Sequence, residues 1–139
     1  MHWPATYRAQ TLPAEAGKPE VRYFNIEPAS SGTYGLLSAI DLKAGGKLLW
    51  QTKLPEPLIG GALATAGGLV FTGEGGGDFS AFDVKSGKKL WSFNTGAGVN
   101  APPIAYRSGG KDFVAVAAGG SQLWGFRQGG AVIAFGLAD

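Results

Sequence analysis

Apolar and polar residues alternate over short segments of this chain, and Gly, Asn or Asp residues separate these segments. A period of two residues is typical of strands that bury one face. No segment repeats apolar residues at the i, i+3, i+4, i+7 spacing long enough to predict a helix. The pattern therefore predicts an all-β protein, which leaves a sandwich, a barrel or a propeller open. The clearest predicted strands are 35–41, 68–73, 78–84, 89–94, 112–118 and 131–137.

One motif occurs twice, as "AIDLKAGGKLLW" at 39–50 and as "AFDVKSGKKLW" at 81–91, with the two Asp residues 42 positions apart. A repeat of about 40–45 residues is typical of the four-stranded blades of a propeller. We therefore predict β-propeller blades, about three four-stranded antiparallel units with the last one incomplete. Their expected ranges are 1–53 for a first blade with a loose front half, 54–97 for a complete second blade, and 98–139 for a third blade that lacks its outer strand.

The repeated residues have predictable structural roles. Asp83 can accept hydrogen bonds from backbone N–H groups of the turn that follows it, and Gly87 can adopt a positive φ. Trp91 is expected to be largely buried against a neighbouring blade, and Trp50 to pack in the same way against residues 60–94. The alternative is that these indoles stack on a ligand.

Composition excludes several classes of function. Gly accounts for 24 of 139 residues, which indicates many tight turns, and the net charge of +2 comes from scattered residues rather than from the basic face of a nucleic-acid-binding protein. There is no Cys and no apolar run long enough to span a membrane, and the first residues lack the apolar region of an export signal. The stretch "GEGGGD" at 73–78 is predicted to be a hairpin turn and not a phosphate loop. Glu74 and Asp78 alone make a poor calcium site, because calcium takes six to eight oxygens.

Four segments together resemble a known family: "AFDVKSGKKLW", "GGALATAGGLVFTGEGGGDFSAFD", "TGAGVNAPPIAYRSGGKDFVAVAAGG" and "AVIAFGLAD". They are similar to the C-terminal part of quinoprotein alcohol dehydrogenases of the methanol and ethanol dehydrogenase type. These are eight-bladed propellers with tryptophan-docking motifs, and they carry pyrroloquinoline quinone (PQQ) and usually calcium. The resemblance covers residues 34–139 well, with "HWPATY" as a weaker match. It implies an oxidoreductase that acts on alcohols in the periplasm.

The resemblance does not extend to the family's catalytic residues. Its aspartate base, its Glu and Asn calcium ligands, its arginine beside the quinone and its adjacent cysteines have no counterparts here. No catalytic residue and no metal ligand is therefore predicted in this chain. PQQ and calcium are expected in the complete enzyme, and neither is expected to bind to this chain alone.

Two loops are predicted to line part of the cofactor pocket. One contains Ile59, Gly60 and Gly61, where relatives carry a tryptophan near positions 58–59 and where the glycines allow close backbone approach. The other is the long connection 118–131, which carries Trp124. The alternatives are an ordinary Gly-Gly start of a strand and an exposed, variable loop.

Two functions remain open at this point. The chain is either the C-terminal propeller part of a PQQ-dependent alcohol dehydrogenase, inactive alone, or a non-enzymatic propeller module that serves as a binding or assembly scaffold. The expected partners are the upstream blades or further copies of the chain, and no nucleic acid is expected. The strand at 131–137 is predicted to have an unpaired edge, which favours concentration-dependent association.

Overall fold

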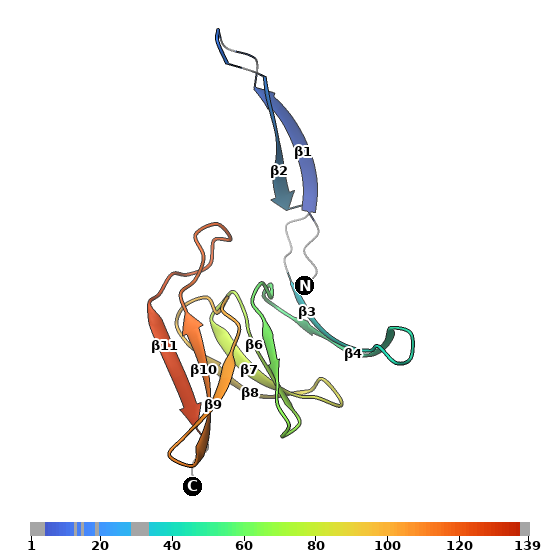
Figure 1. Cartoon of the computed structure of the whole chain (residues 1–139), viewed down its shortest axis with the longest axis vertical. Coiled ribbons are helices and arrows are strands. Elements are labelled where there is room, and N and C mark those ends of the chain that lie inside the picture. The colour runs from blue at the N-terminus through green and yellow to red at the C-terminus, as the bar shows by residue number, and fades with distance from the viewer. Residues whose placement is uncertain (1–4, 13, 15, 19, 29–33, 137–139) are drawn as a thin grey trace.

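The computed structural model describes residues 5–12, 14, 16–18, 20–28 and 34–136 (Figure 1). All regular elements among these residues are strands, and all strand pairs are antiparallel, so the predicted all-β class is confirmed. The strands are β1 (Ala5–Leu12), β2 (Val21–Pro28), β3 (Gly35–Asp41), β4 (Lys47–Leu54), β5 (Ala62–Ala64), β6 (Leu69–Gly73), β7 (Asp78–Asp83), β8 (Lys89–Asn94), β9 (Ile104–Ser108), β10 (Lys111–Ala118) and β11 (Ala131–Gly136).

Strands β5 to β8 form one four-stranded sheet in chain order. Phe71 on β6 pairs with Ala81 on β7, which pairs in turn with Trp91 on β8. The strands predicted at 68–73, 78–84 and 89–94 are therefore confirmed, with ends shifted by a residue or so. Gly-containing turns connect them, and Gly77 and Gly87 adopt positive φ values of 103° and 69°, a conformation that costs glycine little.

Strands β9, β10 and β11 form a three-stranded sheet with β10 in the middle. Within the described residues β11 pairs only with β10. The predicted unpaired edge is therefore present over 131–136.

The first part of the chain forms two separate hairpins. Strands β1 and β2 pair with each other, as do β3 and β4, but β2 and β3 do not pair within the described residues. Figure 1 shows the β1–β2 hairpin extending away from the other sheets. The single first blade expected over 1–53 therefore stays a prediction.

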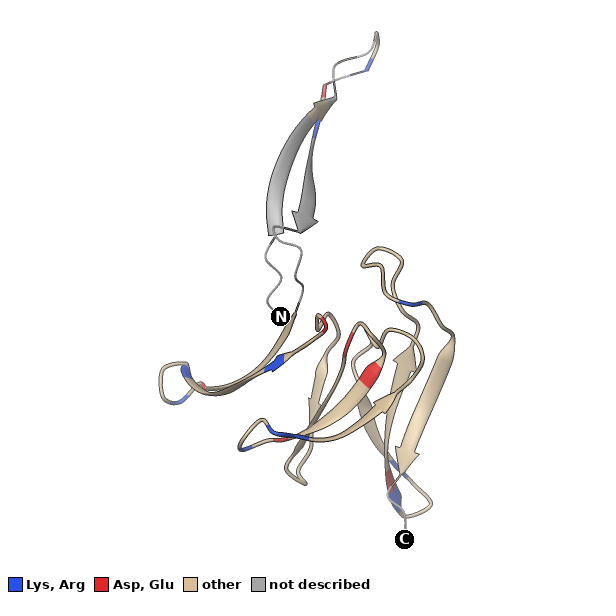
Figure 2. Cartoon of the chain, turned by 180° about the vertical axis from the view of Figure 1, so that it is seen from behind, with Lys and Arg blue, Asp and Glu red and all other residues tan. Residues whose placement is uncertain are grey.

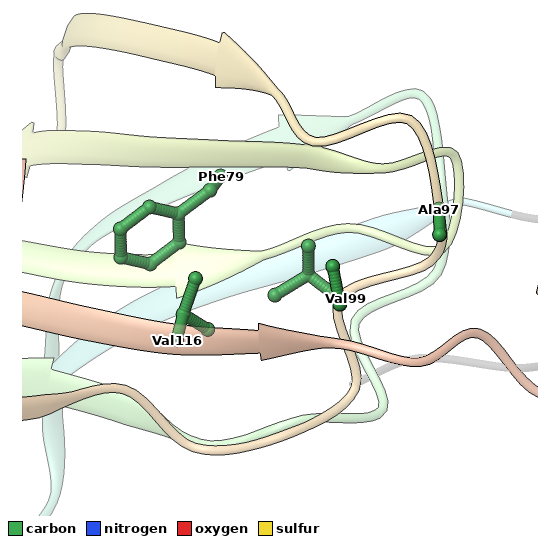
Figure 3. Packing of buried hydrophobic residues seen from close by; sticks show 5 residues of the cluster. Phe79, Ala97, Val99 and Val116 are labelled. Carbon is green, nitrogen blue, oxygen red and sulfur yellow. The ribbon is translucent and has the colours of Figure 1, made fainter. Parts of the chain in front are cut away.

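The sheet β5–β8 buries apolar residues on both faces, as its strand β7 shows. Phe79, which is fully buried, packs with Val99 and Val116 between this sheet and β9–β11 (Figure 3). On the opposite face Phe82, also fully buried, packs with Leu54 and Leu58 beside the β3–β4 sheet. Successive residues of a strand point to opposite faces, and Phe79 and Phe82 are three positions apart, so their rings lie on opposite faces of the sheet and belong to different cores. The register shift between β7 and β8 after Ala81 does not change this arrangement.

Trp50 on β4 lies against the turn that joins β7 to β8. Its indole Nε1 donates a hydrogen bond to the carbonyl of Val84 at 2.9 Å, and Thr52 Oγ1 donates one to the carbonyl of Gly87 at 2.6 Å. A Cβ built on Gly87 would lie only 2.7 Å from Trp50 Cδ2, so the indole needs a glycine beneath it. This contact agrees with the packing predicted for Trp50.

The prediction of a largely buried Trp91 is wrong in extent, because this residue is 40% exposed. Its ring does face the neighbouring sheet, with the centroid of Phe135 on β11 at 5.1 Å. Trp50 is covered because it lies on the turn that follows β7. The residues that follow β11 in the next sheet, 137–139, lie outside the described residues.

Candidate functional site

The two glycines predicted to approach a cofactor lie just before β5. A Cβ on Gly60 would lie 2.9 Å from the carbonyl oxygen of Asn100, and one on Gly61 would lie 2.7 Å from Pro102 Cβ. The space that a Cβ of either glycine would occupy is therefore taken by the segment that leads into β9. Ile59 is half-buried, while its neighbour Leu58 belongs to the core beside β3–β4.

The long connection 119–130 lies on the segment 95–103. Gly98 N donates to Arg127 O at 2.9 Å, and Gly120 N donates to Gly98 O at 2.8 Å. Phe126 packs against Gly75, where a Cβ would lie 2.8 Å from Phe126 Cδ1. These contacts hold the loop of Trp124, itself half-buried, over the β6–β7 turn of the neighbouring sheet.

Three connecting segments thus lie against a fourth, residues 95–103. They are 57–62, the β6–β7 turn 74–77 and the connection 119–130. Besides the contacts above, Gly75 N donates to Pro57 O at 3.2 Å, and Val99 N donates to Glu74 O at 3.1 Å. The two predicted loops, 57–62 and 118–131, are linked through the 95–103 segment. The sequence did not indicate this role for 95–103, and the only signal was its density of small residues.

Glu74 is a buried member of this group, not a residue on a flexible turn. Its side chain is 1% exposed, and its Oε1 lies 2.9 Å from Lys89 Nζ. Lys89 Nζ also lies 5.6 Å from the centroid of the Phe82 ring. A buried carboxylate requires such a charged partner, since desolvation of an unpaired charge costs several kcal/mol. The pair fixes the β6–β7 turn to β8 and leaves Oε2 without a hydrogen-bond partner.

Asn100 contributes a second set of unpartnered buried atoms, because neither Nδ2 nor Oδ1 has a hydrogen-bond partner. A buried polar atom left unpaired costs about 1–3 kcal/mol. The described residues include no group of three or more His, Cys, Asp or Glu side chains that could hold a metal ion. Asp78, the other carboxylate of the Gly-rich turn, accepts a hydrogen bond from Asn94 Nδ2 at 2.8 Å.

Figure 2 shows charged side chains at hairpin turns and also on the connecting segments. On these segments Glu56 directly precedes 57–62, Glu74 lies in the β6–β7 turn and Arg127 lies in the connection 119–130. At the turn after β7 the hydroxyl of Ser86, followed by backbone N–H groups, lowers the pKa of Asp83 below its ordinary value of 3.8. In the β9–β10 hairpin a hydrogen bond from Arg107 lowers the pKa of Asp112 in the same way. Asp112 is exposed and Asp83 is half-buried, and both carboxylates stabilise turns. Nor do the described residues form a helix that is long and apolar enough to cross a membrane.

Comparison with known proteins identifies the class to which this arrangement belongs. Residues 5–114 match the family described as "PQQ: Glucose/ethanol/alcohol dehydrogenase, beta-propeller domain". Because this match covers most of the chain, the protein belongs to that family of quinoprotein propellers.

Individual relatives agree with this assignment. The chain is 41% identical over 128 residues to a quinoprotein ethanol dehydrogenase of Pseudomonas aeruginosa, which corresponds to 89% of this chain and 20% of the relative. It is 45% identical over 105 residues to the quinoprotein alcohol dehydrogenase PedE of Pseudomonas putida, over 73% of this chain and 16% of the relative. The chain therefore spans about a fifth or less of the length of these relatives.

Solved structures give the same picture. The quinohemoprotein alcohol dehydrogenase from Comamonas testosteroni superimposes with a TM-score of 0.68 at 33% identity, over 83% of this chain and 18% of that one. A europium-containing methanol dehydrogenase superimposes with a TM-score of 0.66 at 32% identity, over 82% of this chain and 20% of that one.

Proposed function

We propose that this chain forms the C-terminal propeller part of a PQQ-dependent alcohol dehydrogenase that works in the periplasm. The observation that carries the proposal is the match at 41% identity to a quinoprotein ethanol dehydrogenase over 89% of this chain but only 20% of the relative. In the complete enzyme the quinone would accept two electrons from an alcohol. The protein would hold and orient the cofactor, which supplies the difficult chemistry.

Within this proposal each sheet is a propeller blade, and the contact of Trp50 is a tryptophan-docking joint between two blades. The indole hydrogen bond to Val84 and the close packing on Gly87 support this role, because they fix both the distance and the rotation between neighbouring sheets. The sheet β5–β8 is then the complete blade of 54–97, and β9–β11 is the incomplete blade of 98–139.

The described residues would supply only an arc of the cofactor pocket. Ile59, Gly60 and Gly61 would offer backbone and apolar surface on one side, and Trp124 would offer an aromatic ring on the other. PQQ carries three carboxylates, whose charge requires cations or a metal ion nearby. The described residues contain no metal-binding group. The fit is therefore partial, and no catalytic step is assigned to this chain.

A second function, a binding or assembly scaffold, is favoured by one observation. Among the described residues β11 pairs only with β10, and exposed apolar side chains lie on this strand or against it. Val132 of β11 is 80% exposed, and the rings of Trp91 and Phe93, also exposed, contact Phe135 of β11. An unpaired strand edge with apolar side chains promotes pairing with another chain. Sedimentation velocity over a range of concentrations tests this function, for which we expect defined oligomers, and a monomer at high concentration would contradict it.

The enzymatic proposal is tested in two steps. The chain alone, titrated with PQQ and calcium and then assayed with ethanol and an electron-accepting dye, should show neither micromolar binding nor turnover. Co-expression with the part of the Pseudomonas aeruginosa ethanol dehydrogenase that this chain does not cover should restore quinone binding and activity. Failure of the combined protein to bind PQQ, although it folds, would count against the proposal, as would steady turnover by the chain alone.

A further inference from the structure

Three buried polar atoms in the part of the chain that the structure describes have no hydrogen-bond partner, and they belong to only two residues, Glu74 and Asn100. Glu74 is 1% exposed and uses only Oε1, which lies 2.9 Å from Lys89 Nζ. In Asn100 both Nδ2 and Oδ1 are buried and unpartnered. Native proteins pair almost all of their buried polar atoms, either with protein groups or with ordered water. These three atoms therefore indicate a bound ligand rather than a dry core.

The two residues lie beside one backbone hydrogen bond and beside one further segment. Val99, which precedes Asn100, donates its N–H to the carbonyl of Glu74 at 3.1 Å. Pro57 accepts a hydrogen bond from the N–H of the residue after Glu74 at 3.2 Å. A Cβ on Gly60 would lie 2.9 Å from the carbonyl oxygen of Asn100. The unpartnered atoms therefore belong to segments in direct contact, which is the arrangement that a shared ligand requires.

The burial and the chemistry of these atoms limit the ligand to a water molecule. Because the atoms are buried, neither a cofactor nor a side chain of another protein can reach them from outside. Calcium takes six to eight oxygen ligands, whereas the unpartnered atoms are two oxygens and the Nδ2 donor of Asn100. Water donates two hydrogen bonds and also accepts, and internal waters typically bind to buried polar groups that lack protein partners. It therefore matches both the two acceptors and the donor.

We propose that Glu74 and Asn100 form a binding site for internal water, in which one water molecule donates a hydrogen bond to Glu74 Oε2 and also contacts the amide group of Asn100. This water joins the β6–β7 turn to the segment 95–103, next to the hydrogen bond between Val99 and Glu74. It relieves the cost of leaving a carboxylate oxygen and a side-chain amide unpaired in the interior. The inference does not depend on the proposed function, because neither the quinone nor an alcohol takes part in it.

The test measures magnetisation transfer from water to side-chain amides in the full chain, labelled with ¹⁵N. ROESY spectra separate direct contact with water, whose signals have the opposite sign to the diagonal, from proton exchange, whose signals have the same sign. We expect a strong direct contact at the Nδ2 protons of Asn100, because an enclosed water stays beside them. Asn94 is the matched control, since its exposed amide donates to Asp78 and surface water leaves it quickly. No direct contact at Asn100, or equal contacts at both asparagines, would overturn the inference.

A double variant tests whether Glu74 shares this water. Glu74→Met combined with Lys89→Met removes both charges of the pair at once, and apolar residues of similar volume often replace a buried ion pair without loss of stability. The water contact at Asn100 should then be lost, and an undiminished contact in the folded variant would overturn the shared site. Direct contact of water with the Hγ protons of Glu74, measured in the ¹³C-labelled chain, tests the same point without any substitution. Its absence would also overturn the shared site.

Discussion

Strands β3 and β7 carry the same repeated motif but differ sharply in burial. In β7 four consecutive residues, Phe79 to Phe82, are buried, whereas in β3 only Gly35 is buried. The reason is the number of neighbours: β7 has a strand on each side and a packed core on each face, while β3 pairs only with β4 within the part of the chain that the structure describes. The motif therefore determines the hairpin and its turn, and the adjacent sheets determine how much of the strand is buried. This is the behaviour of a repeat protein, whose stability comes largely from contacts between neighbouring units.

The sharpest test of this comparison replaces the equivalent residues Phe82 and Ile40 by alanine. Phe82→Ala should lower the free energy of unfolding by about 3–5 kcal/mol, because it removes a fully buried ring. Ile40→Ala should lower it by less than about 1 kcal/mol, because that side chain is already 53% exposed. Urea unfolding followed by tryptophan fluorescence measures both, and equal losses would show that the two strands have equivalent surroundings.

The two turn glycines provide the next comparison. Gly87→Ala should cost roughly 2–4 kcal/mol, because the methyl group adds backbone strain at positive φ and also displaces the ring of Trp50. Gly46→Ala should cost about 1–2 kcal/mol from backbone strain alone, since nothing lies near its Cβ position. Thermal unfolding of both variants would contradict this account if Gly46→Ala were the more damaging.

A smaller effect is expected at Thr52, whose hydroxyl donates to the Gly87 carbonyl at 2.6 Å. Thr52→Val keeps the shape of the side chain and removes this hydrogen bond, so we expect a loss of about 0.5–1.5 kcal/mol. Gln51→Ala on the same strand is the control, because its hydrogen bond to Ser38 is exposed and its removal should change stability by under about 0.5 kcal/mol. If both variants lost a similar unfolding free energy in urea, the Thr52 hydroxyl would not contribute to the contact between the sheets.

The smallest effect concerns the pH dependence of stability at the β7–β8 turn, residues 83–87. Because the pKa of Asp83 is lowered in the folded chain, its contribution to stability is complete above about pH 3.8, the ordinary carboxyl value, and is lost as the pH falls through the lowered pKa. Ser86→Ala removes the largest cause of the shift and should return the pKa of Asp83 toward 3.8. Carboxyl ¹³C titration by NMR measures this change, and an unchanged pKa in the variant would assign the shift to the backbone N–H groups alone.

The parts of the fold that depend on nearby residues could be predicted from the sequence. Period-two alternation located the strands at 68–73, 78–84 and 89–94, and the Asp and Gly residues of the motif predicted the hairpin turn, since both signals act within a few residues. The separation of β2 from β3 among the described residues and the 40% exposure of Trp91 could not be predicted in the same way. Both depend on segments that lie farther along the chain or outside the described residues.

The candidate site was predictable only in outline. The loops 57–62 and 118–131 were predicted to line a cofactor pocket, and this stays a prediction. Their contacts with the segment 95–103 had no signal in the sequence, since a contact such as that of Phe126 with Gly75 joins residues about fifty positions apart. The burial of Glu74 could not be predicted, because its partner Lys89 lies on β8, two strands away in the sheet. The unpartnered amide of Asn100 leaves no sequence signal, since an asparagine in a loop is ordinary in composition.

Among the described residues, each sheet consists of strands that follow one another directly in the sequence. Apart from the hairpin that contains the long connection 119–130, the hairpins can therefore close over short loops, with a small loss of chain entropy, before any contact between sheets is made. During synthesis the β5–β8 sheet can form as soon as Asn94 has left the ribosome, without waiting for the residues that follow. The slow events in folding are then the docking of one preformed sheet on the next, and the order of synthesis becomes the order of assembly.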